Sequence, residues 1–498
     1  MLRHTLLAIR PTWRRCENSF QVHLKFPAVA DNRFTSMADT VINTSLEGTS
    51  VERVVACPPL IRERKAMWSG VRLWSFRGLL ALLDQGLISG ANFLVGILLA
   101  RHLAPDRYGA YAMAFEVFLF LSVAYGALVL EPLSVFGSSV YKDSNREYLG
   151  ILLRIHSVIA AVVFLGLGVC ALVLQWIEPS SNMVSALVGV GVATPCVLLF
   201  WLARRGFYVR LSPRHAAAGA FVYSVVVVGG LVVVDHLGHL SPLAAFLLMA
   251  VGAAVTAPMM LARLGLTLKL KSGAYEICEV IRRHWGYGRW ALGSAVAIWF
   301  SGAIYYPILG AFHGLAEAGN LKALMNFSSP IGQAFAAMSL LSLPYAARIH
   351  HHDNLRDRSH LSARLAIIYG GGTIFYWVII VIFREPIVHH LYAGHYADIT
   401  SLVPWLALGS VLRISATSQA VILRAMHSPS LVFVAYAAAS AVAVLLGVPC
   451  TWAFGLAGSV ITLVLSSAVA FVVASALVHR NSLGLKQSSN PPVSVSGS

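Results

Sequence analysis

Long apolar runs recur along the chain from about residue 78 to residue 479, and short polar loops separate them. Each run has about the 20 apolar residues that a helix needs to cross the hydrocarbon core of a bilayer. The pattern predicts twelve transmembrane helices, at residues 78–100, 109–136, 150–175, 183–203, 214–234, 241–262, 289–313, 318–346, 361–383, 402–426, 428–450 and 455–479. We therefore expect an all-α integral membrane protein.

The basic residues alternate between the loops and give the chain an orientation. If the amino terminus is cytoplasmic, 33 of the 37 Lys and Arg residues fall on the cytoplasmic side. The exceptions are Arg101, Arg107, Lys322 and Arg384. Because cytoplasmic loops carry the excess of Lys and Arg in membrane proteins, both termini are predicted to be cytoplasmic.

Composition excludes several other classes of protein. The chain is 57% hydrophobic and 12% charged, which leaves too little polar surface for a water-soluble enzyme. Its formal net charge of +16 lies in short loops, so membrane topology and anionic lipid headgroups account for it, and no nucleic-acid partner is expected. The six cysteines show no CxxC spacing, and neither a disulfide framework nor a metal site is expected.

The two ends of the chain lie outside the apolar pattern. Residues 1–66 contain no span and no signal-peptide core. They are interpreted as a disordered cytoplasmic extension, or as the result of a start assigned upstream of Met67, although their Arg-rich opening also resembles a transit peptide. Residues 481–498 are rich in Ser and are expected to form a disordered tail.

The twelve runs divide into two sets of six. Residues 67–262 are expected to form one lobe and residues 289–480 a second, joined by a cytoplasmic linker at 263–288 that contains an interfacial helix. Six helices return the chain to the same face, so the lobes can be related by a pseudo-two-fold axis along the membrane normal. Both second helices begin after a short turn that ends in glycine, at Gly109 and Gly319.

Motifs near the start carry a family resemblance. Ala81–Gly86, Ser89–Phe93, Leu99–Arg101 and Tyr108–Gly109, with Leu130–Pro132 later, resemble the first two helices of polysaccharide-biosynthesis membrane proteins. These are the Wzx-type O-antigen flippases and exopolysaccharide exporters of the multidrug/oligosaccharidyl-lipid/polysaccharide (MOP) superfamily.

The resemblance implies a two-lobe fold like that of MATE transporters and a protein of the bacterial inner membrane. It implies a non-enzymatic flippase that moves an undecaprenyl-diphosphate-linked oligosaccharide to the periplasm by alternating access. The expected partners are that substrate, membrane lipids and other polysaccharide assembly proteins. Two alternatives remain open: a cation-coupled multidrug antiporter of the same superfamily, and a polytopic polysaccharide polymerase or ligase.

Polar and small residues recur at helical spacing in corresponding spans of both halves. The stripes are Gln85, Ser89, Asn92 and Gly96 in the first span, and Lys322, Asn326, Ser329 and Gln333 in the eighth. Positions i, i+4, i+7 and i+11 share one helix face. Such residues either line a cavity or bind neighbouring helices together. Their occurrence in both halves favours a shared cavity, with Gln85, Asn92, Asn326 and Gln333 as candidate substrate ligands.

Charges within the spans are stronger signals, because a charge at mid-bilayer costs roughly 2.5–3.5 kcal/mol on insertion scales. Asp84, Glu116 and Glu131 are candidate coupling or ion-pair carboxylates. Arg413, Thr417 and Arg424 share one face of the tenth span and are candidate ligands for a diphosphate, whose oxygens match guanidinium donors. An ion pair between Arg413 and Glu116 is the structural alternative.

The sequence gives only weak signals of a catalytic site or a cofactor site. The sequence contains no GxxxxGK[ST] motif, so no P-loop nucleotide hydrolysis is expected. Three consecutive histidines, His350–His352, cannot share one helix face and are interpreted as a solvated loop. No cofactor is expected.

Overall fold

The structure is a computed structural model that describes residues 60–266, 277–335, 338–339, 342, 355–426 and 428–488. The chain divides into two units, Met1–Met67 and Trp68–Ser498, and the packing described below belongs to the second. The predictions for His350–His352, residues 1–59, linker residues 267–276 and tail residues 489–498 lie outside the described residues.

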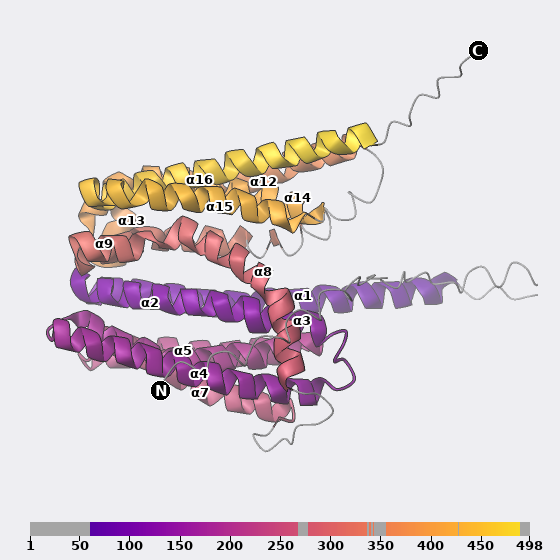
Figure 1. The fold of residues 1–498 in the computed structure, drawn as a ribbon, viewed down its shortest axis with the longest axis horizontal. Helices are drawn as coiled ribbons and strands as arrows, with labels where there is room; N and C mark the ends of the chain where they lie inside the picture. Colours follow the sequence, from indigo (N-terminus) through magenta and orange to yellow (C-terminus); the bar gives the residue numbers. More distant parts are fainter. Residues whose placement is uncertain are drawn as a thin grey trace, which may run out of the picture. The chain divides into compact units, whose positions relative to one another are not determined.

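All regular elements of the described residues are helices (Figure 1). The first half contains α1 (Leu60–His102), α2 (Pro105–Tyr125), the π-helical turn η1 (Gly126–Leu130), α3 (Glu131–Phe136), α4 (Asn145–Ile177), α5 (Asn182–Val209), α6 (Pro213–His236) and α7 (Pro242–Arg263). The second half contains α8 (Ile277–Ala303), α9 (Tyr305–His313), α10 (Leu315–Asn326), α12 (Leu355–Ile382), α13 (Arg384–Tyr392), the 3₁₀ turn η2 (Ala397–Leu402), α14 (Val403–Ala425), α15 (Pro429–Leu445) and α16 (Gly447–Ser488).

The helices follow the predicted spans. Among the described residues, nine helices are long and apolar enough to cross a membrane. A tenth span results if Ala291–Ala303 and Tyr305–His313, bent by 42°, are counted together. The predicted eleventh span coincides with the shorter apolar helix α15, and the predicted eighth begins in α10 and continues past the described residues.

Packing groups the helices into an N-lobe, from residue 68 of α1 to the end of α7, and a C-lobe, from α8 to α16. In the N-lobe α5 packs against α2, α4 and α7, and α6 packs against α7. In the C-lobe α16 packs against α9, α14 and α15, and α12 packs against α14. The two lobes meet where α2 packs against α10 and where α8 packs against η1.

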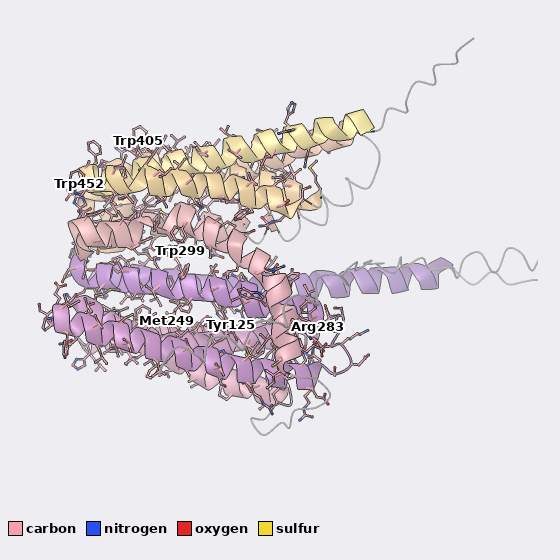
Figure 2. All side chains as sticks on the ribbon, viewed as in Figure 1. Tyr125, Met249, Arg283, Trp299, Trp405 and Trp452 are labelled. Atoms are coloured by element: carbon pink, nitrogen blue, oxygen red, sulfur yellow. The ribbon has the colours of Figure 1, made fainter. Side chains whose placement is uncertain are left out.

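The outer surface of the lobes is apolar, as a bilayer requires. One face of α4 is exposed along several turns, at Val158, Val162, Leu165, Val169 and Leu172. Exposed tryptophans mark helix ends that the topology places on one membrane face, at Trp176, Trp405 and Trp452. Figure 2 shows Trp405 and Trp452 at the same end of the C-lobe. This distribution is typical of interfacial aromatic residues.

The predicted linker helix forms the first turns of α8 and continues into the seventh span, as the bend of α8 in Figure 1 shows. Val280 is fully buried, whereas Ile281 and Trp285 are exposed. His284 completes the buried side: its Nδ1 lies 2.9 Å from the Leu128 carbonyl oxygen, and its Nε2 lies 2.6 Å from the Tyr148 hydroxyl. Burial lowers the pKa of His284, which favours a neutral ring that joins α8 to the N-lobe.

The topology gives a labelling prediction. A cysteine that replaces exposed Asp106 should react with a membrane-impermeant thiol reagent added to intact cells, because position 106 is predicted to face the periplasm. A cysteine at Asp353, outside the described residues, should react only after the membrane is permeabilised. Labelling of position 353 in intact cells would contradict the two-lobe topology.

Candidate functional site at the contact between the lobes

The lobes touch most closely where α2 and α10 begin. A Cβ atom built on Gly109 would overlap the carbonyl oxygen of Leu315. A Cβ atom on Gly319 would lie 2.5 Å from the Pro105 carbonyl oxygen and 3.1 Å from the Gly109 nitrogen. Only glycine allows two backbones to approach so closely. The sequence predicts these glycines at the ends of equivalent turns, whereas the structure places them inside α2 and α10, near the start of each helix. The two glycines form one contact, which we call the glycine seal.

Hydrogen bonds reinforce the glycine seal farther along α10. Asn326 is buried, and its Nδ2 donates to the Tyr108 hydroxyl of α2 at 3.0 Å and to the Tyr392 hydroxyl at 3.5 Å. A Cβ atom on Gly96 would lie 3.4 Å from Asn326 Oδ1. The two polar stripes meet at this point, and Asn326 there joins α2 to the C-lobe.

One ion pair crosses between the lobes beside the glycine seal. Lys322 Nζ of α10 lies 3.5 Å from Glu116 Oε1 of α2, and the two side chains are 14% and 8% exposed. The ammonium also lies 4.6 Å from the centre of the Phe115 ring and 5.8 Å from that of Tyr306. The structure therefore gives Glu116 a different ion-pair partner from the Arg413 that the sequence suggested.

Arg413 lies near this pair, on α14. Its guanidinium nitrogens lie against Gly302 of α8, four residues before Tyr306. Its side chain is exposed, as is that of Arg424 nearer the end of α14. The half-buried Thr417 donates its hydroxyl to the Arg413 carbonyl oxygen at 3.0 Å. We call Glu116, Lys322 and Arg413 the lobe charge cluster, which has one negative and two positive groups.

A second buried charge cluster lies within the N-lobe. Asp84 of α1 is 1% exposed and accepts two hydrogen bonds from Arg204 of α5, at 3.2 Å from Nε and 2.6 Å from Nη2. The Tyr208 hydroxyl donates to the same carboxylate. Such forked pairing satisfies the hydrogen-bonding capacity of the carboxylate. The arrangement fits a structural role for Asp84 that fixes α1 against α5.

The remaining predicted residues differ in exposure and in hydrogen-bond partners. Gln85 is exposed, and its Nε2 lies 3.4 Å from Ser89 Oγ. Asn92 is half-buried, and Gln333 is exposed. Glu131 is exposed and accepts a hydrogen bond from the Tyr287 hydroxyl at 3.1 Å. Burial and the Glu131 carboxylate raise the pKa of Tyr287 to about 12.

Sequence reasoning did not identify the partners of the two buried carboxylates. The sequence placed Lys322 in a polar stripe and on the outer face, and it placed Arg204 in the loop between the predicted spans 183–203 and 214–234. A cation within an apolar span is a signal that a carboxylate lies nearby. That signal could have paired Lys322 with Glu116, but it does not choose among several carboxylates.

The glycine seal gives a conformational prediction. Gly109→Ala should force α2 and α10 apart, because its methyl group would overlap the Leu315 carbonyl group. We expect the ratio of closed to open molecules at this contact to fall by about tenfold or more, which corresponds to roughly 1.4 kcal/mol. Distances between spin labels on exposed Arg107 and Ala316 would measure the ratio.

Gly126→Ala is the matched control for this prediction. It places the same methyl group in helical backbone, with no other atoms within 4 Å. An unchanged distance distribution in Gly109→Ala, or an equal change in Gly126→Ala, would contradict the role of the glycine seal.

Comparison with known proteins identifies the fold. No family model and no curated protein sequence matches the chain. Solved structures do match: an inward-facing multidrug-resistance MATE family transporter of the MOP superfamily aligns with a TM-score of 0.71, at 12% identity, over 82% of this chain and 96% of that one. An outward-facing MATE transporter aligns at 0.59, with 11% identity, over 82% and 95% of the two chains.

A third similar structure is a MOP superfamily transporter from Pyrococcus furiosus, described as having a binding pocket of reverse polarity that suggests a different function. Its TM-score is 0.60, at 10% identity, over 82% of this chain and 95% of that one. At such identities the likeness establishes the fold, which is the MATE-like fold of the MOP superfamily.

Proposed function

We propose that the protein is an alternating-access transporter that moves a lipid-linked oligosaccharide with a diphosphate headgroup across the bacterial inner membrane. The observation that carries the proposal is the exposed guanidinium of Arg413, which is the surplus positive charge of the lobe charge cluster. The fold is one in which both inward-facing and outward-facing structures are known. Their substrates do not identify the substrate of this chain.

The charge balance favours an anionic substrate. Glu116 is engaged by Lys322, which leaves the Arg413 charge as the surplus in the lobe charge cluster. An exposed cation within a span is unfavourable unless water or an anion compensates it. A diphosphate supplies that compensation, and its oxygens match the forked donors of guanidinium better than they match an ammonium. Exposed Arg424 on the same helix extends the basic surface toward the predicted cytoplasmic end.

A cation-coupled multidrug antiporter is the second candidate. Glu116 favours it, because a buried carboxylate that joins both lobes is suited to couple proton or sodium binding to their movement. The two candidates differ in the charge of the transported molecule. An antiporter for cationic drugs needs acceptors in its substrate site, whereas the lobe charge cluster carries a net positive charge.

Binding to the full chain in lipid nanodiscs tests the proposal. Undecaprenyl diphosphate should raise the unfolding temperature, because a ligand that binds only the folded state stabilises that state. Undecaprenol, with the same chain and no diphosphate, should not. Arg413→Ala should reduce the effect, and Arg384→Ala, which changes a half-buried arginine in α13, should preserve it. Stabilisation by a cationic dye and not by the diphosphate would instead favour the antiporter.

A further inference from the structure

The Glu116–Lys322 ion pair lies next to the glycine seal on the same helix faces. Glu116 follows Gly109 by seven residues on α2, and Lys322 follows Gly319 by three on α10. These separations place each charge on the same face as its glycine, within about 11 Å along the helix. The pair therefore extends the closed contact between the lobes and is adjacent to the tightest part of that contact.

Opening the glycine seal must also separate this ion pair. The carboxylate belongs to the N-lobe and the ammonium to the C-lobe, and both are largely buried at 3.5 Å. A buried charge that loses its partner is strongly destabilised unless another partner replaces it. Without a substitute partner for Lys322, the pair opposes separation of α2 from α10.

Arg413 is placed to bind an anion that would serve as the substitute partner for Lys322. Its exposed guanidinium lies against Gly302, four residues before Tyr306, and the centre of the Tyr306 ring lies 5.8 Å from Lys322 Nζ. An anion held by Arg413 would approach Lys322 as well. It would compete with Glu116 for the ammonium and, having the same sign as the carboxylate, would repel it.

We propose that the Glu116–Lys322 pair is a latch between the lobes, and that a substrate diphosphate releases it. Arg413 holds the diphosphate, Lys322 exchanges the Glu116 carboxylate for a phosphate oxygen, and repulsion between Glu116 and the phosphate moves α2 away from α10. The loaded transporter thus opens at the glycine seal, and the empty one stays closed there. The latch itself follows from the lobe contact, and the identity of the releasing anion rests on the proposed function.

The test measures the distance between spin labels on Arg107 and Ala316 in the full chain, with its native cysteines replaced, in nanodiscs. Glu116→Gln removes the charge and keeps the shape, and it should raise the open population about tenfold without ligand. Exchanging the residues, as Glu116→Lys with Lys322→Glu, should restore the closed population. Glu317→Gln is the matched control, because the Glu317 carboxylate accepts from Asn320 of its own helix.

Undecaprenyl diphosphate should open the wild type, whereas undecaprenol should not, and Glu116→Gln should show little further opening. A wild-type distance distribution in folded Glu116→Gln would overturn the latch. Equal ligand-induced opening in wild type and Glu116→Gln would overturn release through this pair. If undecaprenyl diphosphate stabilises the wild type without opening it, the latch proposal fails and the proposed function survives. If it neither stabilises nor opens the wild type, the proposed function fails.

Discussion

Asp84→Asn is expected to destabilise the protein by about 3–5 kcal/mol, the usual effect of removing one partner from a buried ion pair. Asp84 is 1% exposed and Arg204 is 12% exposed, so the guanidinium that remains would lack compensation from water. The Tyr208 hydroxyl would also lose its charged acceptor. Thermal unfolding of the detergent-purified full chain would measure the effect as a large fall in melting temperature.

Two comparison variants separate charge pairing from other causes. Asp84→Leu with Arg204→Met replaces both charges by apolar groups and should recover most of the stability. Glu279→Gln breaks the pair between Glu279 and Arg283, which are 34% and 44% exposed, and should cost about 0.5 kcal/mol or less. If Asp84→Asn unfolds at the wild-type temperature, Asp84 does not have the structural role described here.

Arg413→Lys is expected to lower transport of the lipid-linked oligosaccharide by about tenfold to a hundredfold. The substitution keeps the charge and loses the forked donors, and a hydrogen bond to a charged group contributes about 1.5–3 kcal/mol. Thermal stability should change little, because the Arg413 side chain is exposed and Glu116 is paired with Lys322. Transport in proteoliposomes and the melting temperature should be measured on the same preparations.

Arg480→Lys is the matched control, since Arg480 is exposed near the end of α16 and the substitution is the same. It should transport at the wild-type rate. Full transport by Arg413→Lys would remove the guanidinium from the substrate site. A large fall in melting temperature would instead show that Arg413 has a structural role.

The hydrophobic pattern along the chain is sufficient to predict the helices. It is insufficient to predict which helices and side chains contact one another. Apolar run length predicts the spans because one helix satisfies its own backbone within the bilayer. Gly109 and Gly319 were recognisable as equivalent positions near the starts of two helices, but their mutual contact depends on how the lobes dock. The same limit explains why the ion-pair partner of Glu116 was not predicted. Spacing along α2 carries no information about which cation of α10 or α14 faces Glu116.

The polar stripes illustrate a second limit of prediction from the sequence. Helical spacing correctly places Gly96 and Asn326 on faces that meet, and it cannot distinguish a cavity from a helix contact. Asn326 is buried between hydroxyl groups, whereas Gln333 on the same stripe is exposed. The difference arises from the neighbouring helices, in particular from Tyr108 and Tyr392.

Translocation in proteoliposomes is the most direct test of the central claim. The purified full chain is reconstituted with a fluorescent undecaprenyl-diphosphate oligosaccharide, and the fraction that becomes accessible to a membrane-impermeant quencher is followed over time. We predict protein-dependent translocation that Arg413→Lys slows and Arg480→Lys does not, with no uptake of a cationic dye such as ethidium driven by a proton or sodium gradient. Gradient-driven transport of the dye, with no translocation of the lipid-linked oligosaccharide, would contradict the account.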